Sequence, residues 1–272
     1  MNRKFFLIIF CIFSYTTEAK DWTIHAGFEG FNDGEKALGS GGFWGGAGHT
    51  EVVKEPALRR KAAELSIIKN HTGYGKWGGE WDFPQDLRKG DHVWYSVHTY
   101  FPENFDHYSY GEGTRLKFLR IRTVDENNQG HGHNDLYINT KGNLTPYRYI
   151  YEGEQKWVDV GYKEDLIVKD TWENYQMYIA FDDTPKDFGG KAEVIIWKNG
   201  KRLVHITNRK TLKEPDDRAI LARLFTYWNG GAPQTQSMYV DEITITNETP
   251  SWQDKYGFPI IPFYTDPCRL PD

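Results

Sequence analysis

Alternation of apolar and polar residues in the middle of the chain predicts strands whose outward faces carry tyrosine, arginine, histidine, asparagine and aspartate. Exposed faces of antiparallel sheets usually carry lysine, glutamate, threonine and serine instead. Guanidinium groups bind carboxylates through paired hydrogen bonds, and tyrosine or histidine can transfer protons. The predicted surface therefore suits an acidic ligand on which a proton is moved. Its residues are Trp94, Ser96, His98 and Tyr100; Arg120 and Arg122; Asp135, Tyr137 and Asn139; and Tyr147, Tyr149 and Tyr151.

Lys117 has two possible orientations. Simple alternation places it on the same side as Leu119 and Ile121, which we expect to face the core. A β-bulge, or a strand that begins at Lys117, would instead place it beside Arg120 and Arg122.

The composition favours a sugar-binding surface over a nucleic-acid interface. Aromatic residues make up 16% of the chain, with 10 Trp and 17 Tyr, whereas the net charge is only -5. Many of these rings must fill a core, but amphipathic rings also stack on the apolar face of a pyranose. We therefore expect a polysaccharide ligand and a monomer that binds neither nucleic acid nor a membrane.

The first residues predict export. A positive segment at 1–4, an apolar run at 5–14 and small residues before position 20 are typical of a secretory signal peptide, and the run is too short to span a bilayer. We assign residues 1–19 to this signal and expect the mature protein to be secreted or periplasmic. Its single cysteine, Cys268, cannot form an internal disulfide.

About ten short alternating segments, separated by Gly, Pro, Asn and Asp, predict an all-β fold. Asn199-Gly200 predicts a hairpin, because both residues tolerate the positive φ that a type I′ turn requires. No repeat or linker divides residues 20–272. We therefore expect a single domain that forms a two-sheet antiparallel β-jelly-roll sandwich of the concanavalin-like kind.

Several motifs resemble those of jelly-roll polysaccharide lyases. They are Tyr100–Asp106 (YFPENFD), Leu116–Leu119, the Tyr149-Ile150-Tyr151 triplet and Phe225–Ile243. This part of the chain is similar to the family 14 alginate and glucuronate lyases and to the related heparin-lyase and glucuronan-lyase groups. The family's lysine and paired tyrosines correspond to Lys117, Tyr149 and Tyr151. The family's serine and arginine have no clear counterpart, and Asp135 and Tyr137 lie nearest to their places.

The resemblance implies a secreted lyase that cleaves a uronate-containing polysaccharide of the alginate or glucuronan type by β-elimination, without a cofactor in the chemistry. Cations would neutralise the uronate carboxylate, and tyrosine or histidine would act as base and acid. A tyrosine base needs neighbouring cations, because its ordinary pKa is about 10. The predicted catalytic residues are Tyr149, Tyr151, Lys117, His98 and Arg122. The predicted substrate-binding residues are Arg120, Asn134, Tyr137, Tyr147 and Trp228.

Two other functions and a metal site follow from particular residues. A non-catalytic carbohydrate-binding protein would use the same fold and the same aromatic rings. A glycoside hydrolase would need paired carboxylates on one strand face; Glu80-Trp81-Asp82 begins such a pattern, but Gln85 replaces the last glutamate. Glu29 and Asp241 resemble the pair that many jelly rolls use for a structural calcium ion.

Overall fold

The computed structural model describes residues 20–36, 50–74, 77–108, 115–140 and 145–265. The predicted signal peptide, the glycine-rich stretch at 39–48 and Cys268 lie outside these residues. In the described part of the chain, no helix is long and apolar enough to span a membrane.

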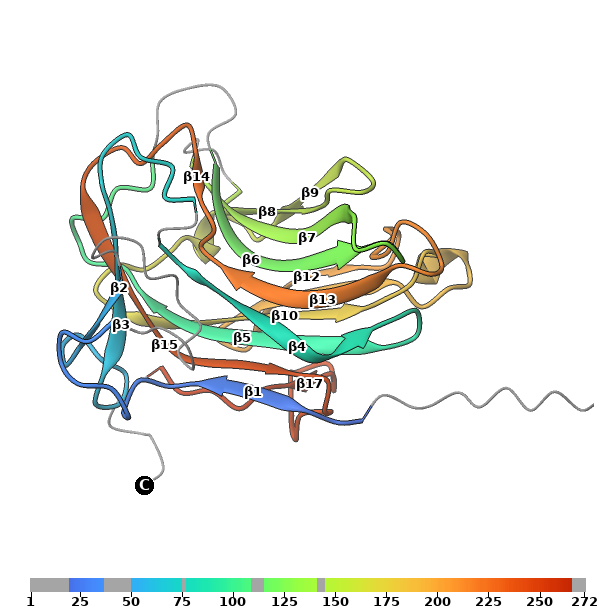
Figure 1. Cartoon of the computed structure of the whole chain (residues 1–272), viewed down its shortest axis with the longest axis horizontal. Helices are drawn as coiled ribbons and strands as arrows, with labels where there is room; N and C mark the ends of the chain where they lie inside the picture. Colours follow the sequence, from blue (N-terminus) through green and yellow to red (C-terminus); the bar gives the residue numbers. More distant parts are fainter. Residues whose placement is uncertain (1–19, 37–49, 75–76, 109–114, 141–144, 266–272) are drawn as a thin grey trace, which may run out of the picture.

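Two large antiparallel sheets form the molecule (Figure 1). Sheet A has the order β12-β11-β10-β5-β15-β3-β2, with β1 paired to β15. Its strands are β1 (Thr23–Ala26), β2 (Thr50–Val53), β3 (Ala62–Ile67), β5 (His92–Tyr100), β10 (Trp172–Ala180), β11 (Glu193–Lys198), β12 (Lys201–Ile206) and β15 (Gln236–Thr246). The prediction of an all-β jelly-roll sandwich is confirmed.

Sheet B has the order β4-β13-β6-β7-β8-β9, with β14 paired to β6. Its strands are β4 (Gly79–Leu87), β6 (Arg115–Val124), β7 (Gly130–Asn139), β8 (Tyr147–Tyr151), β9 (Lys156–Val160), β13 (Arg218–Leu224) and β14 (Trp228–Asn229). Two short 3-10 helices, η2 (Lys163–Asp165) and η3 (Lys186–Phe188), lie in the connections. The inner faces of both sheets contribute to one continuous apolar core.

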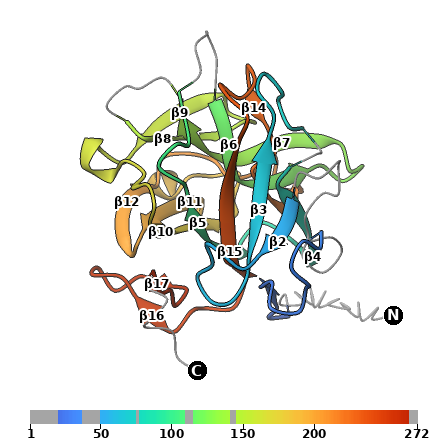
Figure 2. The ribbon, with the colours of Figure 1, turned by 90° about the vertical axis from the view of Figure 1, so that its left-hand side faces the viewer.

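Local sequence explains the turns and the covered outer face of sheet A. Asn199 and Gly200 have φ values of 47° and 73° and join β11 to β12, as the hairpin prediction required. A small hairpin of β16 (Trp252–Gln253) and β17 (Pro259–Ile260) lies at the lower left in Figure 2. Ile260 packs in an apolar cluster with Trp94 of β5 and Trp197 of β11, so the C-terminal segment covers these strands.

A β-bulge in β6 decides the orientation of Lys117. The register between β6 and β7 shifts between Lys117 and Leu119. Phe118 and Leu119 therefore both enter the core, and Lys117 turns to the outer face of sheet B with Arg120. Of the two orientations that the sequence allowed, the structure has the bulged one.

Candidate active site

The outer face of sheet B carries the chemically competent side chains. Cross-strand pairing aligns Arg223 of β13 with Arg120 of β6, and Arg120 with Asp135 of β7. The neighbouring row aligns Lys117 of β6 with Tyr137 of β7. Because opposite residues on one face of a sheet lie about 5 Å apart at Cβ, these rows bring cations, a carboxylate and a phenol together.

The carboxylate of Glu152 lies at the centre of this group. Glu152 follows the last residue of β8, and its Oε1 lies 3.2 Å from Lys117 Nζ, 3.6 Å from Arg120 Nη2 and 3.5 Å from Tyr137 Oη. Its Oε2 lies 3.2 Å from His133 Nδ1. Four side chains from β6 and β7 thus surround one carboxylate, and we call these five residues the Glu152 site.

Asp135 holds the cationic side chains of Arg120 and Lys117 in place. It is fully buried, and its Oδ1 accepts a 2.6 Å hydrogen bond from Arg120 Nε, while its Oδ2 lies 3.8 Å from Lys117 Nζ. Arg120 Nη1 also donates to Thr226 Oγ1 at 2.8 Å. The Arg120 guanidinium is therefore held in place independently of Glu152.

The contacts of His133 define its tautomer. Arg223 Nη1 lies 3.2 Å from His133 Nε2, and a guanidinium can only donate, so Nε2 must accept. The ring proton then resides on Nδ1 and is donated to Glu152. Burial lowers the pKa of His133, an effect that the contact with Glu152 partly offsets, so the ring is held in its neutral form. Arg223 is itself paired with Glu80 at 2.8 Å.

An aromatic and cationic group extends the face beyond Tyr137. The Tyr137 ring lies 5.2 Å from that of Trp157 on β9, which has the guanidinium carbons of Arg115 and Arg148 at 4.7 and 4.9 Å from its centroid. The ring of Tyr227 lies 4.5 Å from Lys117 Nζ. These rings offer stacking surfaces, and the arginines offer positive charge next to the Glu152 site.

The protonation states at the Glu152 site differ between its two acidic groups. Burial, followed by the negative charges of Asp135 and Glu152, raises the pKa of the Tyr137 hydroxyl well above its ordinary value. Burial also raises the pKa of Glu152, but the hydrogen bond with His133 and the charges of Lys117 and Arg120 outweigh it, so the net shift is downward. Tyr137 keeps its proton here, and the site stabilises a carboxylate.

The prediction that the tyrosines of β8 face outward is wrong. Tyr149 is 1% exposed and donates from its hydroxyl to Asn134 Oδ1 at 2.5 Å, inside the sandwich. Tyr147 lies in the same interior with its hydroxyl 2.8 Å from that of Tyr175, and Tyr151 is buried as well. Burial raises the pKa of Tyr149 and Tyr151. The predicted pair is therefore not placed on the face that carries Lys117, and Asn134 does not reach that face either.

Two further predicted residues lie elsewhere. Trp228 is fully buried in the core and its ring stacks 6.2 Å from that of Phe105. His98 is buried on β5 of sheet A, where its Nε2 lies 3.3 Å from Asn174 Nδ2. Neither belongs to the Glu152 site. Arg122 does lie on the outer face of sheet B, opposite His133 in the register.

Sequence reasoning missed three members of this face. His133 and Glu152 were not among the predicted site residues, and Arg223 was not singled out. The alternation that placed Asp135 and Tyr137 outward also places His133 outward, two positions earlier on β7. Arg223 lies between Ala222 and Leu224, which are both in the core, so the same pattern could have found it.

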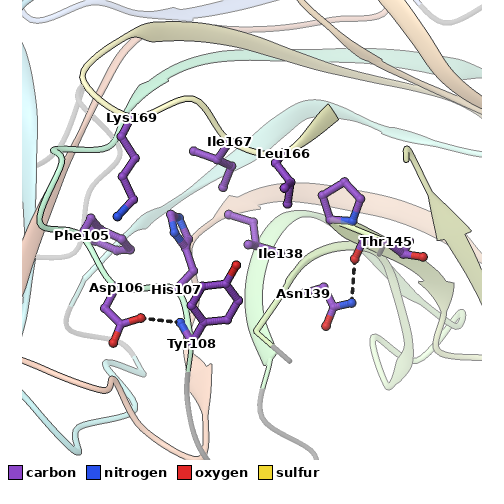
Figure 3. Close-up of a pocket in the computed structure, with 11 residues that line it drawn as sticks. Phe105, Asp106, His107, Tyr108, Ile138, Asn139, Thr145, Leu166, Ile167 and Lys169 are labelled. Carbon is purple, nitrogen blue, oxygen red and sulfur yellow. Dashed lines mark hydrogen bonds between the residues drawn. The ribbon is translucent and has the colours of Figure 1, made fainter. Parts of the chain in front are cut away.

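A separate cavity of about 140 Å³ is lined in part by the last two residues of β7, Ile138 and Asn139 (Figure 3). Phe105, Ile138 and Ile167 give it apolar walls, and His107 and Lys169 add polar groups. It contains no residue of the Glu152 site. The charged chemistry and this cavity are thus separate features of the molecule.

The predicted calcium pair is brought into one region. Asp241 is fully buried; burial, then the negative charges of Glu242 and Glu29, raise its pKa to about 8. These oxygens match the ligand chemistry of calcium. However, Asp241 Oδ2 accepts the N–H groups of Leu58 and Arg59 at 3.2 and 3.3 Å. Within the described ranges, no group of three His, Cys, Asp or Glu side chains is arranged to hold a metal, and the calcium ion stays a prediction.

The fold is similar to that of several solved polysaccharide lyases. A double variant of alginate lyase Aly36B in complex with alginate trisaccharide superposes with a TM-score of 0.60 at 14% identity, covering 82% of this chain and 97% of that one. The marine PL-14 alginate lyase from Aplysia kurodai gives 0.54 at 10% identity, over 84% and 99% of the chains. The endo-β-1,4-glucuronan lyase from the fungus Trichoderma reesei gives 0.51 at 12% identity, over 82% and 94%.

Sequence comparison adds no closer relative, since no family model and no curated protein sequence matches the chain. The likeness therefore concerns the fold and extends over most of the chain. On that basis, the resemblance of this protein to the jelly-roll polysaccharide lyases is confirmed at the level of the fold.

Proposed function

We propose that this protein is a secreted polysaccharide lyase that cleaves a uronate-containing polysaccharide by β-elimination at the outer face of sheet B. The observation that carries the proposal is the convergence of Lys117, Arg120, His133 and Tyr137 on one carboxylate. The similar folds of an alginate lyase and a glucuronan lyase support the substrate class.

The reaction removes the proton on the carbon next to a uronate carboxylate and expels the 4-linked oxygen. Removing that proton develops negative charge next to the carboxylate, so the carboxylate must be neutralised. Arg120 and the Nδ1–H of His133 are suited to this task, because both already point toward a carboxylate. Their interactions with a uronate carboxylate would become stronger as enolate character grows.

Proton transfer falls to the other two members. Tyr137 keeps its proton and is suited to donate it to the leaving oxygen. Lys117 first releases a proton to solvent and then accepts the proton from the carbon. One proton is taken from the carbon and one is given to the oxygen, so the elimination balances.

The test is an assay on alginate, glucuronan and glycosaminoglycans, followed by the ultraviolet absorbance of unsaturated uronate. The wild-type protein should act on at least one polymer, and Lys117→Met should lower kcat by about 10²–10⁴-fold. Lys156→Met is the matched control, since Lys156 is exposed on β9 and pairs with Glu154.

Other products would change the assignment. Saturated reducing ends would indicate a hydrolase, and binding without cleavage across the whole panel would indicate a carbohydrate-binding protein. Full activity of Lys117→Met would remove Lys117 from the chemistry.

A further inference from the structure

Glu152 receives the contacts that a bound ligand would receive. Lys117, Arg120 and Tyr137 approach its Oε1 at 3.2, 3.6 and 3.5 Å, and His133 approaches Oε2 at 3.2 Å. Charge-assisted hydrogen bonds of this kind are the usual means of holding a free carboxylate. The position of the Glu152 side chain thus shows that the Glu152 site accommodates a carboxylate.

Glu152 differs from Asp135, the other carboxylate in contact with these cations. Asp135 is fully buried within β7, whereas the Glu152 side chain is 29% exposed and begins the turn after β8. That turn includes Gln155 with a φ of 60°. Asp135 can only remain where it is, but Glu152 can rotate toward solvent without displacing a strand.

The donors would stay in place if Glu152 left. Arg120 is held by Asp135 at 2.6 Å and by Thr226 at 2.8 Å, and Lys117 retains Asp135 at 3.8 Å. With Glu152 present, the charges of Lys117, Arg120, Asp135 and Glu152 cancel. Once Glu152 has left, the site carries one uncompensated positive charge and four side chains that can hydrogen-bond an anion.

We propose that Glu152 occupies, in the free protein, the position of the substrate's uronate carboxylate, and that the uronate displaces it on binding. The inference rests on the proposed function for the substrate class. A uronate brings the same planar carboxylate and the same charge, so the exchange leaves the charge of the site unchanged. Glu152 is then an internal competitor that lowers the affinity for isolated carboxylates, because only the fraction with Glu152 displaced can bind.

The experiment measures binding of the monosaccharide D-glucuronate by calorimetry, which does not depend on lyase activity. Glu152→Ala should bind glucuronate about tenfold more tightly than the wild type, as expected where the competitor occupies the site about nine-tenths of the time. Neutral D-glucose should bind the two proteins equally. Glu154→Ala is the matched control, because Glu154 lies in the same turn and pairs with Lys156 at 3.1 Å instead.

Two further variants test whether glucuronate binds at the Glu152 site and control for misfolding. Glu152→Gln keeps the volume of the side chain and removes its charge, so it should also bind glucuronate more tightly than the wild type. Adding Lys117→Ala to Glu152→Ala should abolish the gain, because it removes a donor of the same site. Equal or weaker glucuronate binding by both Glu152 variants, with folding verified by their melting curves, would overturn the proposal.

Failure of the two proposals can be told apart. Tight glucuronate binding by Glu152→Ala without unsaturated product from any polymer would support the inference and refute the lyase. Lyase activity in the wild type without any gain in glucuronate affinity would refute the inference alone.

Discussion

At the scale of single residues, Tyr137 and Tyr149 have different roles: the first belongs to the candidate active site and the second to the core. Tyr137 contacts the carboxylate of Glu152 on the outer face of sheet B, whereas Tyr149 donates to Asn134 inside the sandwich. Both hydroxyls have raised pKa values for the same leading reason, burial. A raised pKa therefore does not identify a catalytic tyrosine here, and position on the sheet must decide.

Tyr137→Phe and Tyr149→Phe should therefore have opposite effects. Tyr137→Phe removes the proposed proton donor and should lower kcat by about 10²–10⁴-fold with little loss of stability. Tyr149→Phe should leave kcat nearly unchanged but cost about 1–3 kcal/mol of unfolding free energy, because the buried Asn134 oxygen loses its partner. Product absorbance and urea unfolding measure the two effects, and inactive but stable Tyr149→Phe would contradict the assignment.

At the scale of strands, alternation predicted the face of β7 but not that of β8. In β7, Leu136 and Ile138 are apolar, so Asp135 and Tyr137 could be placed outward correctly. In β8 the pattern Tyr-Arg-Tyr-Ile-Tyr separates two faces without stating which is inner. The tyrosines go inward because the interior supplies hydroxyl partners such as Tyr175 and Asn134. Those partners come from distant parts of the chain, which local pattern cannot reveal.

The register of β6 could not be predicted from the local sequence either. The bulge between Lys117 and Leu119 inserts one residue, and a single insertion reverses the face of everything before it. Sequence could offer this as one of two alternatives but could not choose. Knowledge of the paired strand was needed to place Lys117 beside Arg120.

The covered outer face of sheet A gives a prediction for strand β5. His98 lies there, buried, between Asn174 of β10 and Asp241 of β15 in the register. Burial lowers its pKa to about 4, an effect that backbone hydrogen bonds to Glu242 and Tyr264 only partly offset. The folded state thus binds the proton more weakly than the unfolded state, whose histidine has a pKa of about 6.5. The stabilisation is full above pH 6.5 and is lost as the pH falls toward 4.

Unfolding free energy should accordingly drop by about 3 kcal/mol between pH 6.5 and pH 4 through His98 alone, at about 1.36 kcal/mol per pKa unit. His98→Gln should flatten this part of the profile in urea titrations at a series of pH values. His71→Gln is the control, since His71 is exposed. An unchanged slope in His98→Gln would show that other groups cause the acid sensitivity.

At the scale of the whole molecule, Asp241 of β15 links segments that are far apart in sequence. It accepts N–H groups from Leu58 and Arg59, and its pKa is raised by burial, then by the charges of Glu242 and of Glu29 near the start of the described chain. A cation there would relieve the repulsion among the carboxylates. Opposing this, the Lys61 ammonium already donates to the main-chain oxygens of Glu29 and Phe31. A calcium ion would have to compete with that internal cation for carbonyl oxygens.

Melting curves measured with calcium or with a chelator decide whether a calcium ion binds here or the Lys61 ammonium takes its place. If calcium binds, a concentration 100-fold above its Kd adds about 2.7 kcal/mol. For a chain of this size that raises Tm by roughly 5–11 °C, at about 2–4 °C per kcal/mol. Asp241→Asn should abolish the rise, whereas Asp187→Asn, at an exposed position of η3, should retain it. If the wild-type Tm is the same in both solutions, Lys61 and Arg59, which pairs with Glu242 at 3.3 Å, supply the positive charge here, and the fold joins its N-terminal segment to β15 without a metal.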